Sequence, residues 1–193
     1  MPCPTLVNGS FNFPPEITPP FPLNPNPYYT SVSAGSIVTF DISAIDTNLY
    51  AGNISQDVTL EITGGQVSNN FIDNTLCDNP PCATFSNIMT GQVPPISSPT
   101  VAEGTFLWET ACDQIAADAG CGNTSSIYRF AIKAYDDFCP ANAITIATIT
   151  IEVTAVDSLP KPNFECAWES LNGDVTLNWD HAIGTSPSTV YQI

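Results

Sequence analysis

The sequence predicts an all-β fold: an antiparallel β-sandwich, followed by the first strands of a second β-sandwich. Short segments alternate between apolar and polar residues with a period of two, which places the apolar side chains on one face of a strand. Turn signals rich in glycine and proline separate these segments, and almost no segment shows the 3.6-residue period of a helix. Many short strands joined by turns are typical of a sandwich.

The clearest strands form a hairpin between Ser126 and Asp157. Two alternating runs, residues 128–134 and 144–153, flank a turn of sequence DDFCPAN that begins at Asp136 and contains two carboxylates, a cysteine and a proline. Successive strand residues point to opposite faces, so we expect Asp136 and Asp137 to point apart.

Shorter signals predict the remaining elements of the first sandwich. Proline-punctuated chain up to residue 35 predicts extended or edge-strand backbone, because proline blocks helices and central strands. The other expected elements are short or regular strands at 16–18, 36–45, 56–63 and 103–110, an irregular stretch at 66–102, and one or two helical turns within 111–122.

The sequence after Asp157 predicts a change of domain. Residues 158–162 contain two prolines and form a linker, and strands at 163–169 and 173–179 surround Asn172-Gly173, a strong two-residue hairpin signal. We therefore expect residues 1–13 to be a linker or the end of a preceding repeat, 14–157 to be one sandwich, and 163–193 to be the truncated start of another.

The charge balance narrows the classes of partner. Three basic residues, Arg129, Lys133 and Lys161, stand against 19 acidic ones, giving a net charge of −16. Nucleic acids and anionic membranes need Lys and Arg for binding, so neither is an expected partner. An acidic surface attracts cations, calcium above all, although the acidity is equally explained as a solubilising property of an extracellular protein.

The seven cysteines favour disulfides in an oxidising compartment over a metal site. Cys77 and Cys82 flank a short loop that a disulfide can close, and no second cysteine pair or nearby histidine makes them a zinc site. No stretch has the length of a transmembrane helix, and no signal peptide is recognisable, so an exported chain would be mature or a fragment.

Catalysis is not expected. Glu109 with Asp113, or Asp136 with Asp137, are the paired carboxylates, and the single histidine, His181, lies in the second domain, away from any nucleophile of the first. Trp108 and Tyr128 are candidate sugar-stacking platforms, but aromatic residues on alternating strands are more often part of a core.

The hairpin resembles the end of a cadherin-type repeat, where a strand ends in Ala-x-Asp before a proline turn, as in residues 134–140 here. Residues 44–48, AIDTN, are similar to the acidic loop that follows the second cadherin strand. The resemblance implies an immunoglobulin-like, cadherin-like sandwich with calcium ligands at Asp46, Asn48, Asp136 and Asp157. The chain departs from the pattern at Ala34, where cadherins have glutamate, and in lacking an Asn-Asp continuation of the linker.

A broader resemblance is to the PKD- or cadherin-like repeats of large gliding motility-associated, type IX-secreted bacterial surface proteins. The motifs that carry it are WETACD from Trp108, YRFAI from Tyr128, DDFCP from Asp136, NPPCAT from Asn79 and NGDVTLNW from Asn172. The last motif is similar to the start of a fibronectin type III-like domain.

This broader resemblance implies disulfides Cys77–Cys82 and Cys112–Cys139, and it leaves the pairing of Cys3, Cys121 and Cys166 open. Asp157-Ser158-Leu159 fits the O-glycosylation pattern of the same bacterial group, with Ser158 as the acceptor.

The expected function is a non-catalytic extracellular repeat of a bacterial cell-surface adhesin or filament protein, acting as spacer or adhesive unit. Its expected partners are neighbouring repeats of the same chain, other copies in a filament and surface glycans. The alternative is a calcium- or glycan-binding accessory module of a secreted protein.

Overall fold

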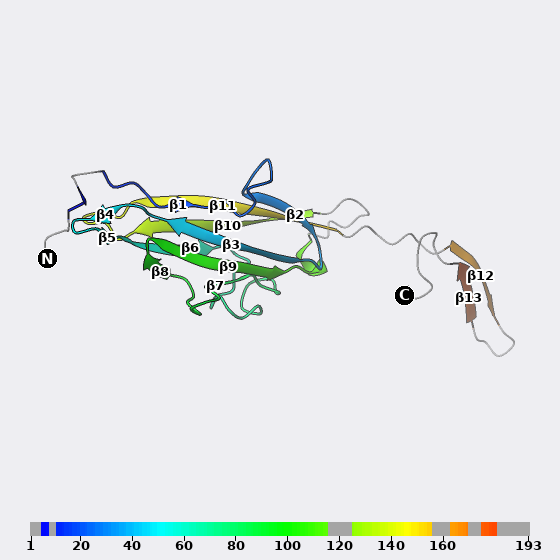
Figure 1. Ribbon diagram of the computed structural model, residues 1–193. Coiled ribbons are helices and arrows are strands. Elements are labelled where there is room, and N and C mark those ends of the chain that lie inside the picture. The colour runs from blue at the N-terminus through cyan, green and yellow to red at the C-terminus, as the bar shows by residue number, and fades with distance from the viewer. Residues whose placement is uncertain (1–4, 8–10, 116–124, 156–162, 170–174, 181–193) are drawn as a thin grey trace. The chain divides into compact units, whose positions relative to one another are not determined.

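The computed structural model describes residues 5–7, 11–115, 125–155, 163–169 and 175–180. The chain divides into two compact units, Met1–Ala155 and Val156–Ile193. The first unit is a sandwich of two β-sheets (Figure 1). Among the residues described, no helix has the length and apolar character needed to cross a membrane.

The two sheets of the first unit have four and five strands. The order is β1–β3–β9–β7 in one sheet and β2–β11–β10–β6–β8 in the other, and β4 and β5 form a separate two-stranded ribbon. The strands are β1 (Glu16–Ile17), β2 (Tyr29–Ser33), β3 (Ile37–Ile45), β4 (Leu49–Tyr50), β5 (Ile54–Ser55), β6 (Asp57–Thr63), β7 (Thr84–Ser86), β8 (Ile96–Pro99), β9 (Val101–Glu109), β10 (Ser125–Asp136) and β11 (Ile144–Thr154).

The strand order is that of an immunoglobulin-like sandwich, which confirms the predicted fold class. The first extended segment is divided between the sheets: β1 pairs antiparallel with β3, whereas β2 pairs parallel with β11. The proline-rich loop between β1 and β2 carries the chain from one sheet to the other.

The period-2 pattern locates the core correctly. Phe130, Ile132 and Ala134 of β10 are buried, and Ile149 and Ile151 of β11 are buried opposite them. Strands β7 and β8 lie in the stretch expected to be irregular, and each has only three or four residues, too few to show an alternation. The expected helical turn is a short 3-10 helix, Cys112–Gln114.

Aromatic side chains fill the space between the sheets. Phe40 of β3 stacks on Phe106 of β9 with ring centroids 4.6 Å apart, and Phe106 meets Phe130 of the other sheet edge-on at 4.9 Å. Trp108 contacts Phe130 and Tyr128 in the same edge-on manner. Each fully buried large apolar side chain contributes about 1.5–3 kcal/mol, so this cluster joins the two sheets.

The sandwich has two ends, which the strand registers define. At the acidic end, β3 finishes at Ile45, followed by Asp46, and β10 finishes at Asp136. At the far end, β11 finishes at Thr154, which pairs with Ser125, the first residue of β10. β10 has twelve residues, so the two ends lie about 40 Å apart at roughly 3.3 Å per strand residue.

The second unit contains one described hairpin, formed by β12 (Asn163–Glu169) and β13 (Val175–Asp180). The strands pair antiparallel, with an irregularity in register between Phe164 and Cys166. Both strands were expected from the sequence around Asn172-Gly173.

Candidate functional site

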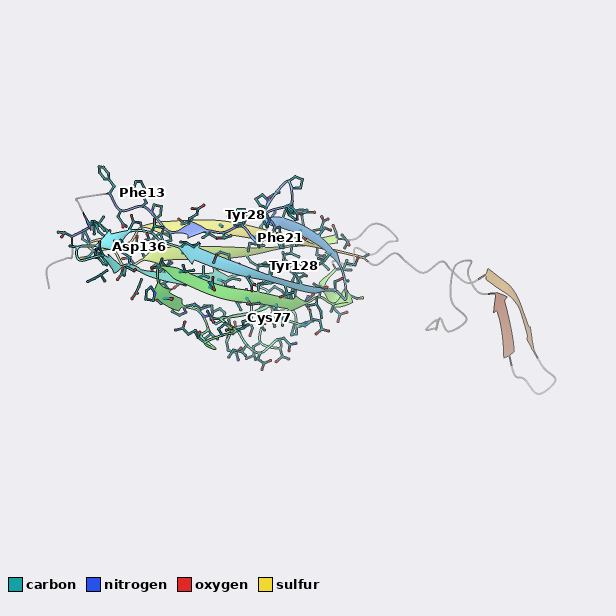
Figure 2. The ribbon with its side chains drawn as sticks, in the orientation of Figure 1. Phe13, Phe21, Tyr28, Cys77, Tyr128 and Asp136 are labelled. Atoms are coloured by element: carbon teal, nitrogen blue, oxygen red, sulfur yellow. A yellow bond between two sulfur atoms is a disulfide. The ribbon has the colours of Figure 1, made fainter. Side chains whose placement is uncertain are left out.

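The acidic end gathers three of the four expected calcium ligands. Asp46 follows β3, Asn48 lies two residues further on, and Asp136 is the last residue of β10. Figure 2 shows Asp136 at this end of the sandwich, on the same side as Phe13 of the N-terminal segment. Asp157 lies outside the described residues, and β11, the strand before it, finishes at the far end.

Asp46 has one satisfied and one unsatisfied carboxylate oxygen. Its Oδ1 accepts hydrogen bonds from the backbone N–H of Asn48 at 2.7 Å and from the Asn48 side-chain amide at 2.6 Å. Its Oδ2 is buried and has no partner, and the residue is only 3% exposed. Burial raises the pKa of Asp46 above its usual value, the Asn48 hydrogen bonds oppose this, and the charges of Asp136 and Asp137 add to it.

Both oxygens of Asp136 are occupied by donors. Oδ1 accepts from the backbone N–H of Phe138 at 3.1 Å and of Ala143 at 2.8 Å, and Oδ2 accepts from the side-chain amide of Asn12 at 2.6 Å. The carboxylate therefore closes the β10–β11 turn and fixes the N-terminal segment.

Asn12 and Gln56 are the site residues that sequence reasoning missed. The side-chain amide of Gln56 donates to Oδ1 of Asn12 at 3.0 Å, so Asn12 links Gln56 to Asp136. Gln56 is 0% exposed, and its Oε1 is buried without a partner. A glutamine one residue before a strand and an asparagine in a proline-rich segment carry no recognisable signal in the sequence.

The two unsatisfied oxygens belong to neighbouring segments. The backbone N–H of Asp46 donates to the carbonyl of Thr100 at 2.8 Å, and the N–H of Thr100 donates to the carbonyl of Gln56 at 3.0 Å. Thr100 itself has a positive φ of 66° at the junction of β8 and β9. A buried acceptor without a donor costs about 1–3 kcal/mol, so each of these two oxygens indicates a place for a donor or a cation.

Tyr50 fastens the β4–β5 ribbon to the same end. Its hydroxyl donates to the Asp137 carboxylate at 3.0 Å and to the Asp137 carbonyl at 2.9 Å. The same carboxylate oxygen accepts the backbone N–H of Asp57 at 3.1 Å. Burial, followed by the bond to Asp137, raises the pKa of Tyr50 well above its usual value. As expected, Asp137 is exposed while Asp136 is buried.

The described residues fit a calcium ion only in part. Within them, no three His, Cys, Asp or Glu side chains are grouped so that they could hold a metal. Calcium takes six to eight oxygen ligands, and the unsatisfied oxygens here are Asp46 Oδ2 and Gln56 Oε1. Further ligands would have to be backbone carbonyls, water or rearranged side chains.

One of the two implied disulfides is present. Cys77 and Cys82 are bonded, with Cα atoms 5.7 Å apart, and the bond closes the loop that precedes β7. Three side chains donate to the Pro81 carbonyl inside this loop: Gln66 at 2.9 Å, Trp108 at 2.9 Å and Gln114 at 2.7 Å. The disulfide loop is therefore docked on the core.

The implied Cys112–Cys139 disulfide is wrong. Cys112 is an exposed free thiol, and Cys139 is disulfide-bonded to another cysteine. Cys112 follows β9 at the far end, whereas Cys139 lies in the β10–β11 turn at the acidic end. β9 alone spans nine residues, about 30 Å, and a disulfide needs Cα atoms within about 7 Å.

Trp108 is not a sugar platform. It is 0% exposed, and its indole N–H donates to Pro81. Tyr128 is partly buried, packs edge-on against Trp108 and donates its hydroxyl to the Gln114 carbonyl. Both residues belong to the core and its margin.

Comparisons with known proteins find a likeness to solved structures alone. No protein-family model matches the sequence, and no curated protein matches it. Among solved structures, the chain is similar to an ASH/PapD-like domain of human CEP192, with 9% identity and a TM-score of 0.36, covering 82% of this chain and 98% of that one.

Two bacterial subunits show the same degree of likeness. The CooA pilin subunit of enterotoxigenic Escherichia coli has 9% identity and a TM-score of 0.35, covering 67% of this chain and 90% of its own. AggA, the major subunit of aggregative adherence fimbriae type I of Escherichia coli, has 11% identity and a TM-score of 0.34, covering 74% and 93%. At these scores we base no functional argument on them.

Proposed function

We propose that this chain is part of a non-catalytic extracellular surface protein, in which the unit Met1–Ala155 acts as a spacer or adhesive repeat. The observation that carries the proposal is the path of the chain through the sandwich. Asn12 is bound at the acidic end, through Asp136, and β11 leaves the sandwich at the far end. A unit whose connections lie at opposite ends extends a chain of repeats in line.

The covalent chemistry supports an exported location. Cys77 and Cys82 form a disulfide, and Cys139 is also disulfide-bonded. Disulfides persist in oxidising compartments and are rare where thiols are kept reduced. A net charge of −16 keeps such a repeat soluble and discourages association with anionic surfaces.

The finer assignment rests on the sequence resemblances. We propose a PKD/cadherin-like repeat at 14–157, a linker at 158–162 and the start of a fibronectin type III-like domain at 163–193, within a gliding motility-associated, type IX-secreted protein. Ser158 is its proposed O-glycosylation site, and neighbouring repeats are its direct partners. The intact mass of the natively produced protein tests the glycosylation.

Surface labelling tests the proposed location. An antibody raised against residues 11–155 should stain intact cells of the source organism, and brief protease treatment of those cells should remove the stain. An antibody against a cytoplasmic protein serves as the control for lysis. Staining that appears only after permeabilisation would overturn the proposal.

We infer calcium binding at the acidic end as a second candidate function, favoured by the buried, unpartnered oxygens of Asp46 and Gln56. Asn48 and Asp136 then hold the loops around the ion, whereas Asp157 follows the strand that finishes at the far end and is not part of this second candidate. Calcium should raise the melting temperature of the chain, and a chelator should reverse the rise.

A matched pair of variants tests the calcium site. Asp46→Asn should abolish the calcium-dependent shift, whereas Asp113→Asn, an exposed carboxylate at the far end, should retain it. A melting temperature indifferent to calcium would rule out this second function and leave the spacer function untouched.

A further inference from the structure

One stretch of β11 has an open backbone edge. β11 pairs with β10 from Ile144 to Thr154, but it pairs with β2 only from Thr150 onward. No described strand pairs with the other side of residues 144–148. Unpaired N–H and C=O groups on a strand edge are a template for another strand.

Hydrogen bonds at either end of the stretch show which groups face the open side. The Thr150 N–H donates to Tyr28 on the β2 side, whereas the Ala143 carbonyl accepts from Asp136 on the β10 side. Because the direction alternates along a strand, the N–H and C=O groups of Ile144, Ile146 and Thr148 all point to the open edge.

The open edge borders a groove of about 530 Å³ between β1 and β11. The Thr145 hydroxyl donates to the Pro15 carbonyl at 2.6 Å and so joins β11 to the segment before β1 beside the groove. Ile144 and Ile146 remain 51% and 67% exposed on the outer face of the sheet. The edge is therefore accessible and apolar.

Three other sheet edges of the described sandwich, those of β7, β8 and β1, are covered or short, whereas the outer edge of the five-residue strand β2 is also open. The β7 edge is covered because Phe71 accepts the N–H of Phe85 and Ala83 accepts that of Ser68. β8 is four residues long and ends at Pro99, and β1 is only two residues long. Residues 144–148, ITIAT, contain neither the proline nor the charge that usually guards an edge.

We propose that this edge binds the same edge of a second copy of the chain, antiparallel and about a two-fold axis at Ile146. Ile146 then faces its counterpart, and Ile144 faces Thr148 of the partner copy, so the two five-stranded sheets become one. A two-fold contact requires a self-complementary edge. This one is uncharged, and the residues whose backbone groups face the partner, Ile144, Ile146 and Thr148, are all β-branched.

The uncharged edge permits a second copy to dock, and the charge of the rest of the chain determines how the contact should respond to salt. Among the described residues that line the groove, Glu16 alone is charged, so two copies meet here without a row of opposed carboxylates. The rest of each chain repels its partner through a net charge of −16. Added salt should therefore strengthen the dimer, whereas it would weaken binding of a basic partner.

Sedimentation of the full chain over a range of concentration and salt tests this inference. The parent should form a reversible dimer. Ile146→Lys places like charges opposite each other, and Ile146→Pro removes an N–H that makes no bond within the sheet; each should weaken the dimer at least about tenfold. Ile127→Lys adds the same charge at an exposed position of β10 away from the edge, and it should leave the dimer intact.

Hydrogen exchange identifies the contact directly. The amides of Ile144, Ile146 and Thr148 should exchange quickly in dilute, low-salt solution and become protected as the dimer forms. As a control for folding, all three lysine and proline variants should keep the parent's circular dichroism spectrum. A chain that stays monomeric in salt at high concentration would overturn the proposal. So would a dimer that ignores the Ile146 substitutions or that leaves these three amides unprotected. The inference does not depend on the proposed cellular location.

Discussion

The side-chain amide of Asn12 donates a 2.6 Å hydrogen bond to Oδ2 of Asp136, a residue 124 positions later in the chain. Through this bond the segment before β1 is held against the turn that joins β10 and β11. The Gln56 amide donates to the same asparagine, so one partly buried side chain satisfies groups from two other segments.

Removing the Asn12 side chain should therefore destabilise the whole sandwich. Asn12→Ala leaves a buried carboxylate oxygen and a buried amide without partners, and we expect a loss of about 1–3 kcal/mol in the free energy of unfolding. Urea denaturation measures it. Asn26→Ala removes an exposed side chain that accepts the N–H of the nearby Tyr28, and it should change stability far less. Equal losses in the two variants would contradict this role of Asn12.

Asp46 should make the folded state less stable as pH rises. Its folded pKa is raised above the usual value near 3.8, so the folded state holds this proton more tightly than the unfolded state does. Stability is thus lost as pH rises from the unfolded pKa through the folded one. In chelator, Asp46→Asn should remove that loss and be more stable than the parent at pH 7 by about 1 kcal/mol.

Asp73, a carboxylate whose pKa shifts in the opposite direction, provides the control. The pKa of Asp73 is lowered by hydrogen bonds from Thr75, so its contribution to stability is present above the unfolded pKa and is lost as pH falls. Asp73→Asn should therefore not reproduce the gain at neutral pH. A less stable Asp46→Asn variant in chelator would show that the buried charge is compensated.

Gly104 of β9 should not tolerate even a methyl group. A Cβ there would lie 2.4 Å and 2.7 Å from two ring atoms of the buried Phe85. Gly104→Ala should cost about 1–3 kcal/mol or more, because the packed core must move to make room. Gly65→Ala meets no atom within 4 Å and is the matched control. Thermal unfolding of both variants measures the two changes in stability. A Gly104→Ala variant as stable as the parent would mean that Phe85 is free to move.

The bonded and the free cysteines should respond differently to substitution and to thiol labelling. Cys82→Ser opens a short disulfide loop and should lower stability by about 2 kcal/mol, the loop-closure value for so few residues. Cys112→Ser should have almost no effect, since Cys112 is exposed and unbonded. Thiol labelling of the native protein should modify Cys112 and leave Cys77 and Cys82 unmodified. A Cys112 that resists labelling would contradict its assignment as a free thiol.

The sequence predicted the sandwich because its long strands obey a local rule. In β10, a period of two places Phe130, Ile132 and Ala134 inward whatever the rest of the chain does. β2 has only five residues within a proline-rich stretch, so its parallel pairing with β11 depends on tertiary structure. The same holds for Cys112, whose distance from Cys139 follows from the length of β9 and not from motif spacing.

For the same reason, only some residues of the candidate site could be predicted from the sequence. Asp46, Asn48 and Asp136 follow or finish strands, and carboxylates after strands can be found by pattern. Gln56 and Asn12 join them through backbone contacts at Thr100 and through a segment from the start of the chain. Nor does the sequence reveal that both oxygens of Asp136 accept hydrogen bonds, from the β10–β11 turn and from Asn12.

The parallel pairing of β2 with β11 should make the first unit resist stretching. Both strands run from the acidic end toward the far end, in register from Tyr29–Thr150 to Ser33–Thr154. Tension on the two connections pulls β2 toward one end and β11 toward the other, so their hydrogen bonds are loaded together in shear. Single-molecule stretching of the chain should therefore show one high-force unfolding event for this unit.

Two proline variants separate this shear contact from general stability. The Ala34 N–H donates to the Thr154 carbonyl, so by alternation the Val32 N–H also points at β11 and the Ser31 N–H points away. Val32→Pro should lower the unfolding force, because it removes a bond of the pair, whereas Ser31→Pro on the outer edge should leave the force nearly unchanged. Equal forces in the two variants would place the mechanical resistance elsewhere in the sandwich, and the spacer would then owe its strength to another strand pair.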